Sequence, residues 1–235
     1  MAPRRDLLER CLAALARELA TTPSEAIVVV DDEAQTRGLD SYSVGAFGVL
    51  PLVQPGGAAV RRNAAFGRVS GTVVALIDDD AEPLPGWGAA LVARFADGAD
   101  RVVQGLIRPE FEIEPSPELT PVLFHLGGFN ALDDRRRPDV FISANCAFSR
   151  GVLDAVGSMR SDFGPGSGGV PWGDDTDWHR RATAKGFPTE FDEALAVRHR
   201  IQAGRISVGA VLERAERVGR TLARLEWDDR QPPLG

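Results

Sequence analysis

The stretch from Thr72 to Pro85 constrains the fold more than any other part of the chain. It reads Thr-Val-Val-Ala-Leu-Ile-Asp-Asp-Asp-Ala-Glu-Pro-Leu-Pro, so an apolar, partly β-branched run ends in three carboxylates and two prolines. A short apolar run bounded by such breakers predicts a buried strand. Because carboxylates are costly to bury without a compensating charge, we expect Asp78, Asp79 and Asp80 at the carboxyl end of this strand, where open α/β sheets bind their ligands.

The acidic triplet has two interpretations when it is taken alone. Three neighbouring carboxylates repel one another, and a hard divalent cation, which prefers carboxylate oxygens, would relieve that repulsion. Aspartates that follow a strand are also common in solvated turns and at helix N-caps. By itself the triplet favours the turn, so a metal site needs support from the rest of the chain.

Length and charge exclude several classes of protein. The chain has 235 residues, enough for one large domain or two small ones with a sizeable core. A net charge of −7 argues against binding to nucleic acid, which needs a positive face. No apolar stretch is long enough to span a membrane, and the first residues lack the apolar core of a signal peptide. We therefore expect a cytoplasmic enzyme in which both cysteines, Cys11 and Cys146, are reduced and packed.

Strand and helix patterns alternate in the first half of the chain. Strands are predicted at 26–30, 49–53, 72–77 and 101–107, and helices at 7–19, 60–68 and 87–96. This alternation predicts a largely parallel sheet with helices on both faces. A Pro-rich connection over 109–140, with some helix at 121–129, leads to further elements: a strand at 141–150, a helix at 174–185, a strand at 190–198 and a helix at 208–225.

Three acidic clusters lie where strands end or helices begin. They are Asp31-Asp32, Asp78 to Asp80, and Asp174-Asp175 with Asp177. Each has a structural explanation, since Asp174 or Asp175 would also serve as a helix N-cap favoured by the helix dipole. In a parallel sheet, however, the clusters would converge on one crevice. There one carboxylate would hold a hard cation while another accepts a proton.

The order of these features resembles the family 2 glycosyltransferases of the GT-A fold. The resemblance runs from about Asp6 to Gly219 and rests on the following landmarks: Ile27-Val-Val-Val-Asp31-Asp32, Ala59-Val-Arg-Arg-Asn63-Ala, Ala75-Leu-Ile-Asp78-Asp79-Asp80-Ala-Glu-Pro83-Leu-Pro85-Gly-Trp87, Ser143-Ala-Asn145-Cys-Ala-Phe-Ser-Arg150, Trp172-Gly-Asp-Asp175-Thr-Asp177 and Val197-Arg-His199-Arg. It implies an α/β, GT-A fold with a mixed, mainly parallel sheet flanked by helices. It also implies a single domain with a nucleotide-sugar-binding half, residues 1–108, and an acceptor-binding half with a C-terminal helix, residues 109–235.

The resemblance also assigns roles to individual residues. It implies that Asp78 and Asp80 form the D-x-D motif, which binds Mn²⁺ or Mg²⁺ on the donor diphosphate, and that His199 completes this metal site. Asp175 is the implied general base, in a motif whose first position departs conservatively to Asp174. Asp32 is the implied contact to the base or ribose. The remaining candidates are Asp79, Arg62 and Asn63 for the donor, and Trp172, Asp174 and Asn145 for the acceptor or sugar.

Several of these side chains have simpler explanations. Without the family pattern, a histidine between two arginines is ordinarily a solvated polar residue, so His199 depends on the resemblance. Trp172 would stack on a sugar ring or simply pack, and Arg61, Arg62 and Asn63 would either meet the diphosphate or lie on a solvated helix face. We assign the other two histidines, His125 and His179, to structure.

Together these residues predict a metal-dependent, inverting glycosyltransferase. Asp175 would take the proton of an acceptor hydroxyl, which attacks the anomeric carbon in one displacement. The glycine-rich loop from Gly164 to Gly169 would close over the donor and exclude water. The expected donor is a UDP-, GDP- or dTDP-sugar, and the acceptor is a glycan, a lipid-linked molecule or a small molecule.

One departure from the family concerns the beginning of the chain. The family starts with a strand of the type V-x-V-V-I-P-x-Y-N before its first helix, whereas Met1 to Asp6 leaves no room for it. Its absence would leave neighbouring backbone groups unpaired. The alternative is therefore an inactive GT-A-like binding domain or a truncated gene product. A nucleotidyltransferase is less favoured, because the chain has no glycine and lysine motif that grips phosphate.

Arginines recur along the predicted last helix, where they are Arg205, Arg214, Arg217, Arg220 and Arg224. These side chains would dock on an anionic membrane at the inner face of the cell, where lipid-linked acceptors reside, or form a solvated face interleaved with Glu213 and Glu216. The interleaved charges favour the solvated face.

Overall fold

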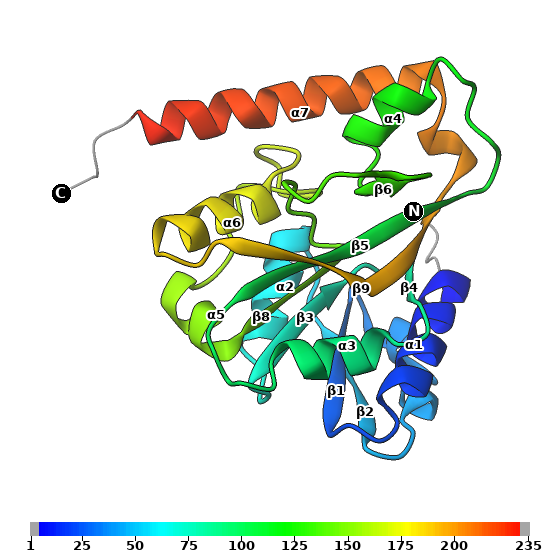
Figure 1. Cartoon of the computed structure of the whole chain (residues 1–235), viewed down its shortest axis with the longest axis vertical. Helices are drawn as coiled ribbons and strands as arrows, with labels where there is room; N and C mark the ends of the chain where they lie inside the picture. Colours follow the sequence, from blue (N-terminus) through cyan, green and yellow to red (C-terminus); the bar gives the residue numbers. More distant parts are fainter. Residues whose placement is uncertain (1–4, 231–235) are drawn as a thin grey trace.

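The computed structural model describes residues 5–230 as one α/β assembly (Figure 1). The helices are α1 (Arg5–Leu19), α2 (Ala58–Phe66), α3 (Trp87–Arg94), α4 (Thr120–Leu126), α5 (Arg150–Val156), α6 (Asp174–Ala184) and α7 (Val208–Asp229), with short 3₁₀ turns η1 (Glu33–Thr36), η2 (Asp40–Tyr42) and η3 (Ala203–Arg205). The strands are β1 (Ser24–Val30), β2 (Phe47–Val53), β3 (Val73–Ile77), β4 (Ala81–Pro83), β5 (Val102–Phe111), β6 (Ala131–Leu132), β7 (Arg135–Arg136), β8 (Asn145–Ser149) and β9 (Thr189–Ile201).

The central sheet is mixed, as expected for this fold. Its five strands lie in the order β3-β8-β5-β9-β4. β5 and β9 run parallel, whereas β8 is antiparallel to both β3 and β5, and β4 is antiparallel to β9. The alternating pattern did not reveal the two reversed strands. β8 enters the sheet after the long connection that follows β5, and β4 is only the short return from the acidic turn.

The first two strands form a separate parallel sheet. β1 pairs with β2 over all seven residues, and within residues 5–230 neither strand has a partner in the central sheet. The Ser70 hydroxyl, just before β3, donates to Glu25 of β1 at 2.8 Å, so the two sheets lie side by side without a shared ladder. Within the described residues, β1, β2 and β3 each have one edge without a strand partner.

The amphipathic first helix anchors the core. Cys11, Leu12, Leu15 and Leu19 are buried on one face of α1 and pack in the same apolar cluster as Trp87. Both cysteines are free and buried, and burial raises the pKa of the Cys11 thiol to about 12. The expectation of reduced, packed cysteines therefore agrees with their positions.

Several predicted boundaries differ from the structure. The strand expected at 141–150 is confined to β8, because Ser149 accepts a hydrogen bond from the Val152 N–H and so caps the short helix α5. The small β6–β7 hairpin lies inside the connection that was predicted to be irregular. The last helix continues to Asp229.

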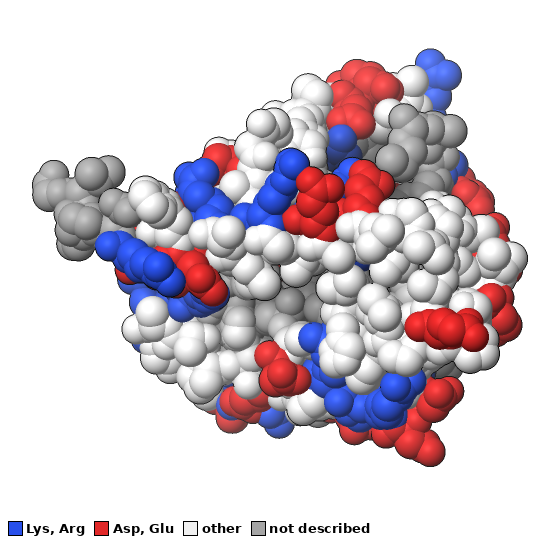
Figure 2. Space-filling view, turned by 90° about the horizontal axis from the view of Figure 1, so that it is seen from above, with Lys and Arg blue, Asp and Glu red and all other residues white. Residues whose placement is uncertain are grey.

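α7 crosses one end of the molecule beside α4, opposite β1 and β2 (Figure 1). Seen from this end, basic and acidic residues are interspersed and form no face of a single sign (Figure 2). The arginines at 217, 220 and 224 form ion pairs with Glu213, Glu216 and Asp228 respectively. These pairs agree with the solvated interpretation of the helix. None of the helices within residues 5–230 is long and apolar enough to cross a membrane.

Candidate functional site

The acidic turn after β3 is placed against β9 by the strand register. The Ala81 N–H donates to the Asp78 carbonyl at 3.0 Å, which closes the turn, and Ala81 then pairs with His199 across the β4–β9 ladder. The Arg200 N–H donates to the Asp80 carbonyl at 2.9 Å. This pairing brings the turn at the end of β3 next to a histidine more than a hundred residues later in the chain.

Asp78, Asp80 and His199 form a cluster that fits a divalent cation. One ligand atom from each lies within 4.8 Å of the others, and Asp80 and His199 are buried. His199 Nε2 lies 3.0 Å from Asp80 Oδ1, and its Nδ1 lies 3.1 Å from the Gly128 carbonyl oxygen. In the tautomer that donates from Nδ1 to this carbonyl, the Nε2 lone pair would be directed at a cation held between His199 and Asp80. Two carboxylates and an imidazole suit Mn²⁺ or Mg²⁺.

Arg62 of α2 connects this cluster with the acidic start of α6. Its Nη1 lies 2.6 Å from Asp174 Oδ2, and its Nη2 lies 3.2 Å from Asp78 Oδ1. Burial disfavours the charge of Arg62, but the neighbouring carboxylates hold its pKa above the ordinary value. Burial also raises the pKa of Asp174 to about 6, with Arg62 opposing the shift and Asp175 adding to it. The second and third acidic clusters are therefore parts of one site.

Asp175 is held at the beginning of α6 by four hydrogen bonds, one of them from the Thr176 hydroxyl at 3.4 Å. Its Oδ2 accepts from the backbone N–H and the hydroxyl of Ser143, both at 3.2 Å, and its Oδ1 accepts from the Thr176 N–H at 2.8 Å. The preceding Gly173 has a left-handed φ of 87°, which turns the chain into the helix. The carboxylate is half-buried and fixed in orientation, as a proton acceptor must be.

The glycine-rich loop before α6 packs against both halves of the site. The Ala58 N–H at the start of α2 donates to the Pro165 carbonyl at 2.9 Å. A Cβ on Gly164 would lie 2.8 Å from Asp174 Cγ, and one on Gly57 would lie 2.8 Å from the backbone carbon of Gly166. Glycine is required here because two backbone segments and a carboxylate meet without room for side chains.

Two residues predicted to contact a ligand make hydrogen bonds within the protein. The Asn145 side chain is fully buried: its Oδ1 accepts from Trp87 Nε1 at 3.1 Å, and its Nδ2 donates to the carbonyls of Leu106 and Leu195. Asn63 makes two 2.8 Å hydrogen bonds with the backbone of Met159. Both amides therefore help to position the fold, and their contact with a ligand stays a prediction.

The first acidic cluster, Asp31-Asp32, has contacts that are separate from those of the other two clusters. Asp31 pairs with Arg61 at 2.5 Å, and Asp32 caps η1 by accepting from the Gln35 N–H at 3.1 Å. Both remain exposed at the end of β1, with side chains accessible to a ligand. Asp79 is half-buried within the turn between Asp78 and Asp80.

Two arginines that were assigned to a solvated surface lie at the site. Arg205 Nη1 is 3.5 Å from Asp80 Oδ2, and the Arg214 guanidinium lies over the Trp172 ring with Cζ 4.5 Å from its centroid. The helical periodicity of the sequence could have identified Arg214 as a residue that faces the rest of the protein. It shares one face of α7 with the buried Val211, Thr221 and Leu225, where a solvated arginine is not expected.

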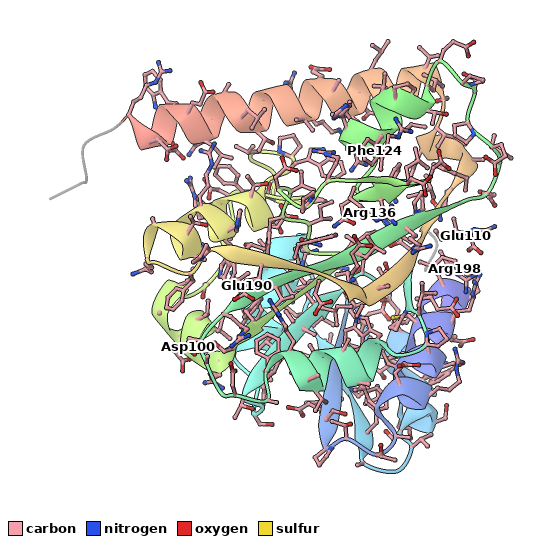
Figure 3. The ribbon with its side chains drawn as sticks, viewed as in Figure 1. Asp100, Glu110, Phe124, Arg136, Glu190 and Arg198 are labelled. Carbon is pink, nitrogen blue, oxygen red and sulfur yellow. The ribbon has the colours of Figure 1, made fainter. Side chains whose placement is uncertain are left out.

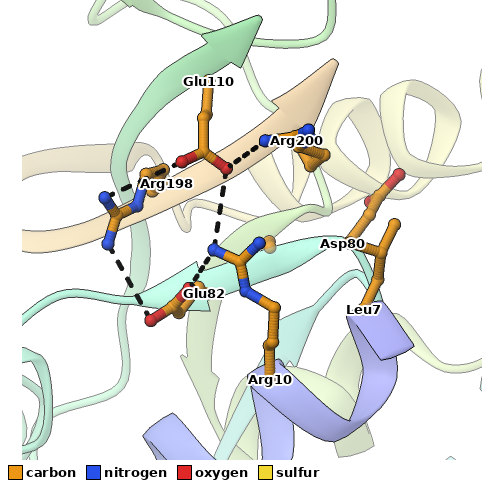
Figure 4. Close-up of a pocket in the computed structure, with 8 residues that line it drawn as sticks. Leu7, Arg10, Asp80, Glu82, Glu110, Arg198 and Arg200 are labelled. Carbon is orange, nitrogen blue, oxygen red and sulfur yellow. Dashed lines mark hydrogen bonds and ion pairs between the residues drawn. The ribbon is translucent and has the colours of Figure 1, made fainter. Parts of the chain in front are cut away.

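A network of ion pairs next to Asp80 links α1, β4, β5 and β9. Glu82 of β4 pairs with Arg10 of α1 at 2.9 Å and with Arg198 of β9 at 3.8 Å, and Glu110 of β5 pairs with Arg200 at 3.1 Å (Figure 4). Figure 3 shows Glu110 and Arg198 at the same edge of the molecule. Since Glu82 and Arg198 are sequence neighbours of the β4–β9 pair formed by Ala81 and His199, the network holds the backbone that carries the metal candidates.

Solved structures of glycosyltransferases share this fold. One is the mannosyltransferase PcManGT from Pyrobaculum calidifontis in complex with GDP-Man and Mn²⁺: its TM-score is 0.66, its identity is 17%, and the match covers 99% of this chain and 64% of that one. GalNAc-T7 with UDP, GalNAc and Mn²⁺ matches with a TM-score of 0.57 and 15% identity, over 91% of this chain and 46% of that one. Staphylococcus aureus TarS 1-349 in complex with UDP-GlcNAc matches with a TM-score of 0.55 and 16% identity, over 85% and 57% of the two chains.

These likenesses establish the GT-A fold, and the chain spans less than two thirds of the length of each of these structures. No curated protein sequence matches the chain significantly. The profile of glycosyl transferase family 2, in contrast, matches residues 3–157, well over half of the chain. The expected resemblance is therefore confirmed, and the protein belongs to glycosyl transferase family 2.

Proposed function

We propose that the protein transfers a sugar from a nucleotide-diphosphate donor to an acceptor hydroxyl, with inversion and with a divalent metal ion. The observation that carries the proposal is the convergence of Asp78, Asp80 and His199 within 4.8 Å. Arg62 joins Asp78 to Asp174, the neighbour in sequence of the proposed base Asp175. This contact supports a single site that contains both the proposed metal ligands and the proposed base.

Asp78, Asp80 and His199 would hold the Mn²⁺ or Mg²⁺ ion, which when bound stabilises negative charge on the departing diphosphate. Arg62 carries a fixed positive charge between the second and third acidic clusters, where it can also pair with phosphate oxygens. Asp175 accepts the proton of the acceptor hydroxyl, and Ser143 keeps its Oδ2 in place. A single displacement at the anomeric carbon then inverts its configuration.

We use the same residues to assign donor binding and acceptor binding to different parts of the domain. We assign donor binding mainly to residues 1–108, with Asp32 as the exposed carboxylate available to the base or ribose and Asp79 within the acidic turn. Acceptor binding is assigned to residues 109–235, which include Trp172 and Asp174. His199 is an exception. It belongs to the second half of the chain, but the β4–β9 pairing brings it next to Ala81 of the first half.

The nature of the donor and the place of action are open to direct test. Structures of the same fold contain GDP-Man, UDP or UDP-GlcNAc, so uridine and guanosine donors are the first to assay, followed by dTDP-sugars. We keep the cytoplasm as the proposed compartment. Peripheral contact with the inner face of the membrane is less favoured, because three α7 arginines already pair with acids of the same helix.

The decisive experiment measures release of nucleoside diphosphate from each donor, with Mn²⁺ and with a chelator. We expect release that needs the metal and falls by at least about a hundredfold in Asp175→Asn. Asp154→Asn, which changes an exposed carboxylate paired with Arg150, is the matched control and should retain activity. Donor binding without turnover in the wild type would instead support an inactive GT-A-like binding domain, and full activity in Asp175→Asn would remove that residue from the base role.

A further inference from the structure

An arginine pair converges on the proposed metal site and has no role in the mechanism above. Arg205 belongs to η3 and Arg214 to α7, and both reach the backbone of Gly128. A Cβ built on Gly128 would lie 3.0 Å from Arg214 Nη2, 4.0 Å from Arg205 Nη2 and 3.9 Å from His199 Cε1. Two guanidinium groups and the edge of the imidazole therefore face the same point.

The charge of Arg214 is not matched by an acid. Within residues 5–230 it makes no hydrogen bond or ion pair, and its Nε is buried without a partner. Burial, followed by repulsion from Arg205, lowers its pKa to about 10, and Asp175 is close enough to oppose the shift. The other arginines of α7 have carboxylate partners. A half-buried guanidinium whose Nε is buried without an acceptor is costly to the fold, and an anionic partner would relieve this cost.

Trp172 supplies a second buried donor without an acceptor at the same place. Its ring lies beneath the Arg214 guanidinium, and its Nε1 has no hydrogen-bond partner. The Thr221 hydroxyl of α7 donates to the Trp172 carbonyl at 3.3 Å, which fixes the position of this residue. Buried indole N–H groups usually find an acceptor, and the other buried indoles, Trp87 and Trp178, do so.

We propose that Arg205, Arg214 and the Trp172 N–H form a subsite for a phosphate group carried by the sugar acceptor. Guanidinium groups present planar pairs of donors that match phosphate oxygens. The acceptor is favoured over the donor because Trp172 lies three residues before the proposed base Asp175, and Arg214 is near enough to Asp175 for their charges to interact. The donor diphosphate already has Arg62 and the metal candidates. Calling the ligand an acceptor rests on the proposed function. The anion site itself does not.

The test uses the four tryptophan indoles as reporters in the ¹⁵N-labelled full chain. Inorganic phosphate is titrated with a chelator present, so that no divalent ion contributes. We expect the Trp172 Nε1–H resonance to move, with Trp172→Phe providing its assignment. The resonances of Trp87 and Trp178 should stay, because their N–H groups already bond to Asn145 Oδ1 at 3.1 Å and to the Gly157 carbonyl at 2.9 Å.

Substitutions then assign the binding to the arginine pair. Arg214→Gln should weaken phosphate binding at least about tenfold, the scale of a lost hydrogen bond to a charged group. Arg220→Gln, an exposed arginine of the same helix paired with Glu216, should leave it unchanged. Should Arg214→Gln fail to fold, Arg214→Lys keeps a positive charge while removing the planar donors, and we expect about threefold weaker binding. An unmoved Trp172 resonance, or equal binding by all variants, would overturn the proposal.

Two further experiments identify the molecule that carries the phosphate and distinguish the proposed anion subsite from the proposed transferase function. Binding of glycerol 1-phosphate alone indicates a soluble acceptor, and sedimentation only with phosphatidylcholine vesicles that contain phosphatidic acid indicates a lipid acceptor. In transfer assays, Arg214→Gln should raise the KM for a phosphorylated acceptor and leave the donor KM unchanged. A rise in the donor KM alone would refute the acceptor assignment. A protein that binds phosphate at Trp172 but transfers no sugar would refute the transferase and leave the anion site standing.

Discussion

Arg62 and Asp174 are 112 positions apart in the sequence, yet their side chains meet at 2.6 Å. This contact joins the helix after β2 to the helix that carries the proposed base. The same guanidinium reaches Asp78 at 3.2 Å. One side chain thus links Asp78 to Asp174, and this link is the structural basis for treating the proposed donor and acceptor sides as a single site.

Loss of Arg62 should destabilise the fold as well as the reaction. Asp174 is nearly inaccessible to solvent, so Arg62→Ala leaves a buried carboxylate without its partner, and we expect a loss of about 3 kcal/mol in the free energy of unfolding. Urea denaturation measures this change. Arg220→Ala removes an exposed partner of Glu216 and should cost less than about 1 kcal/mol. Equal effects in the two variants would contradict the bridging role of Arg62.

The raised pKa of Asp174 predicts a pH-dependent contribution to stability. In the folded protein this carboxyl binds a proton up to about pH 6, whereas its ordinary pKa is 3.8. The folded state therefore binds more protons between these values, and the stability contributed by this group falls as the pH rises from about 4 to 6. The full penalty, up to about 3 kcal/mol, is present above pH 6.

Asp174→Asn removes this titration and isolates its effect. Compared with that of the wild type, the free energy of unfolding of the variant should increase as the pH rises from 4 to 7. The altered contact with Arg62 adds a difference that does not depend on pH. Denaturation of both proteins at several pH values gives the difference between their free energies of unfolding. The contributions of the other carboxyl groups are the same in both proteins and drop out of this difference. A difference that does not change with pH would show that Asp174 ionises normally in the folded protein.

Local signals in the sequence allowed the acidic turn to be predicted, whereas its histidine partner followed from the family resemblance. The apolar run before Asp78 predicted a strand with the carboxylates at its carboxyl end. The family pattern added His199 from a distant segment, and the β4–β9 register brings the two together. The reversed directions of β8 and β4 depend on long-range pairing, which periodicity along the chain does not encode.

The roles of amides and arginines were harder to predict, because they depend on what each side chain contacts. Asn145 lies in a family landmark, but its hydrogen bonds go to Trp87 and two strand carbonyls. Arg214 looked like one more charge on a solvated helix. Only the packing of α7 against Trp172 shows that Arg214 is half-buried, with its Nε shielded from solvent.

Replacing Asn145 should therefore affect stability rather than ligand binding. Asn145→Ala leaves the Trp87 N–H and the carbonyls of Leu106 and Leu195 without partners, and we expect a loss of about 3 kcal/mol or more in the free energy of unfolding. The KM of the folded fraction for its donor should remain unchanged. Gln54→Ala, whose side chain donates only to the neighbouring Pro55 carbonyl, is the control. A stable Asn145→Ala variant with a raised donor KM would support the sugar-contact assignment.

Addition of Mn²⁺ should raise the unfolding temperature of the protein, because the ion would bind a cluster that exists only in the fold. At a hundredfold excess over the dissociation constant the expected stabilisation is about 2.7 kcal/mol. His199→Ala removes the nitrogen that faces Asp80 and should abolish most of the shift, and Asp80→Asn should do the same. His125→Ala, which changes an exposed histidine outside the cluster, should retain it. Thermal unfolding with Mn²⁺ and with a chelator makes the comparison, and an equal shift in His199→Ala would place the ion elsewhere.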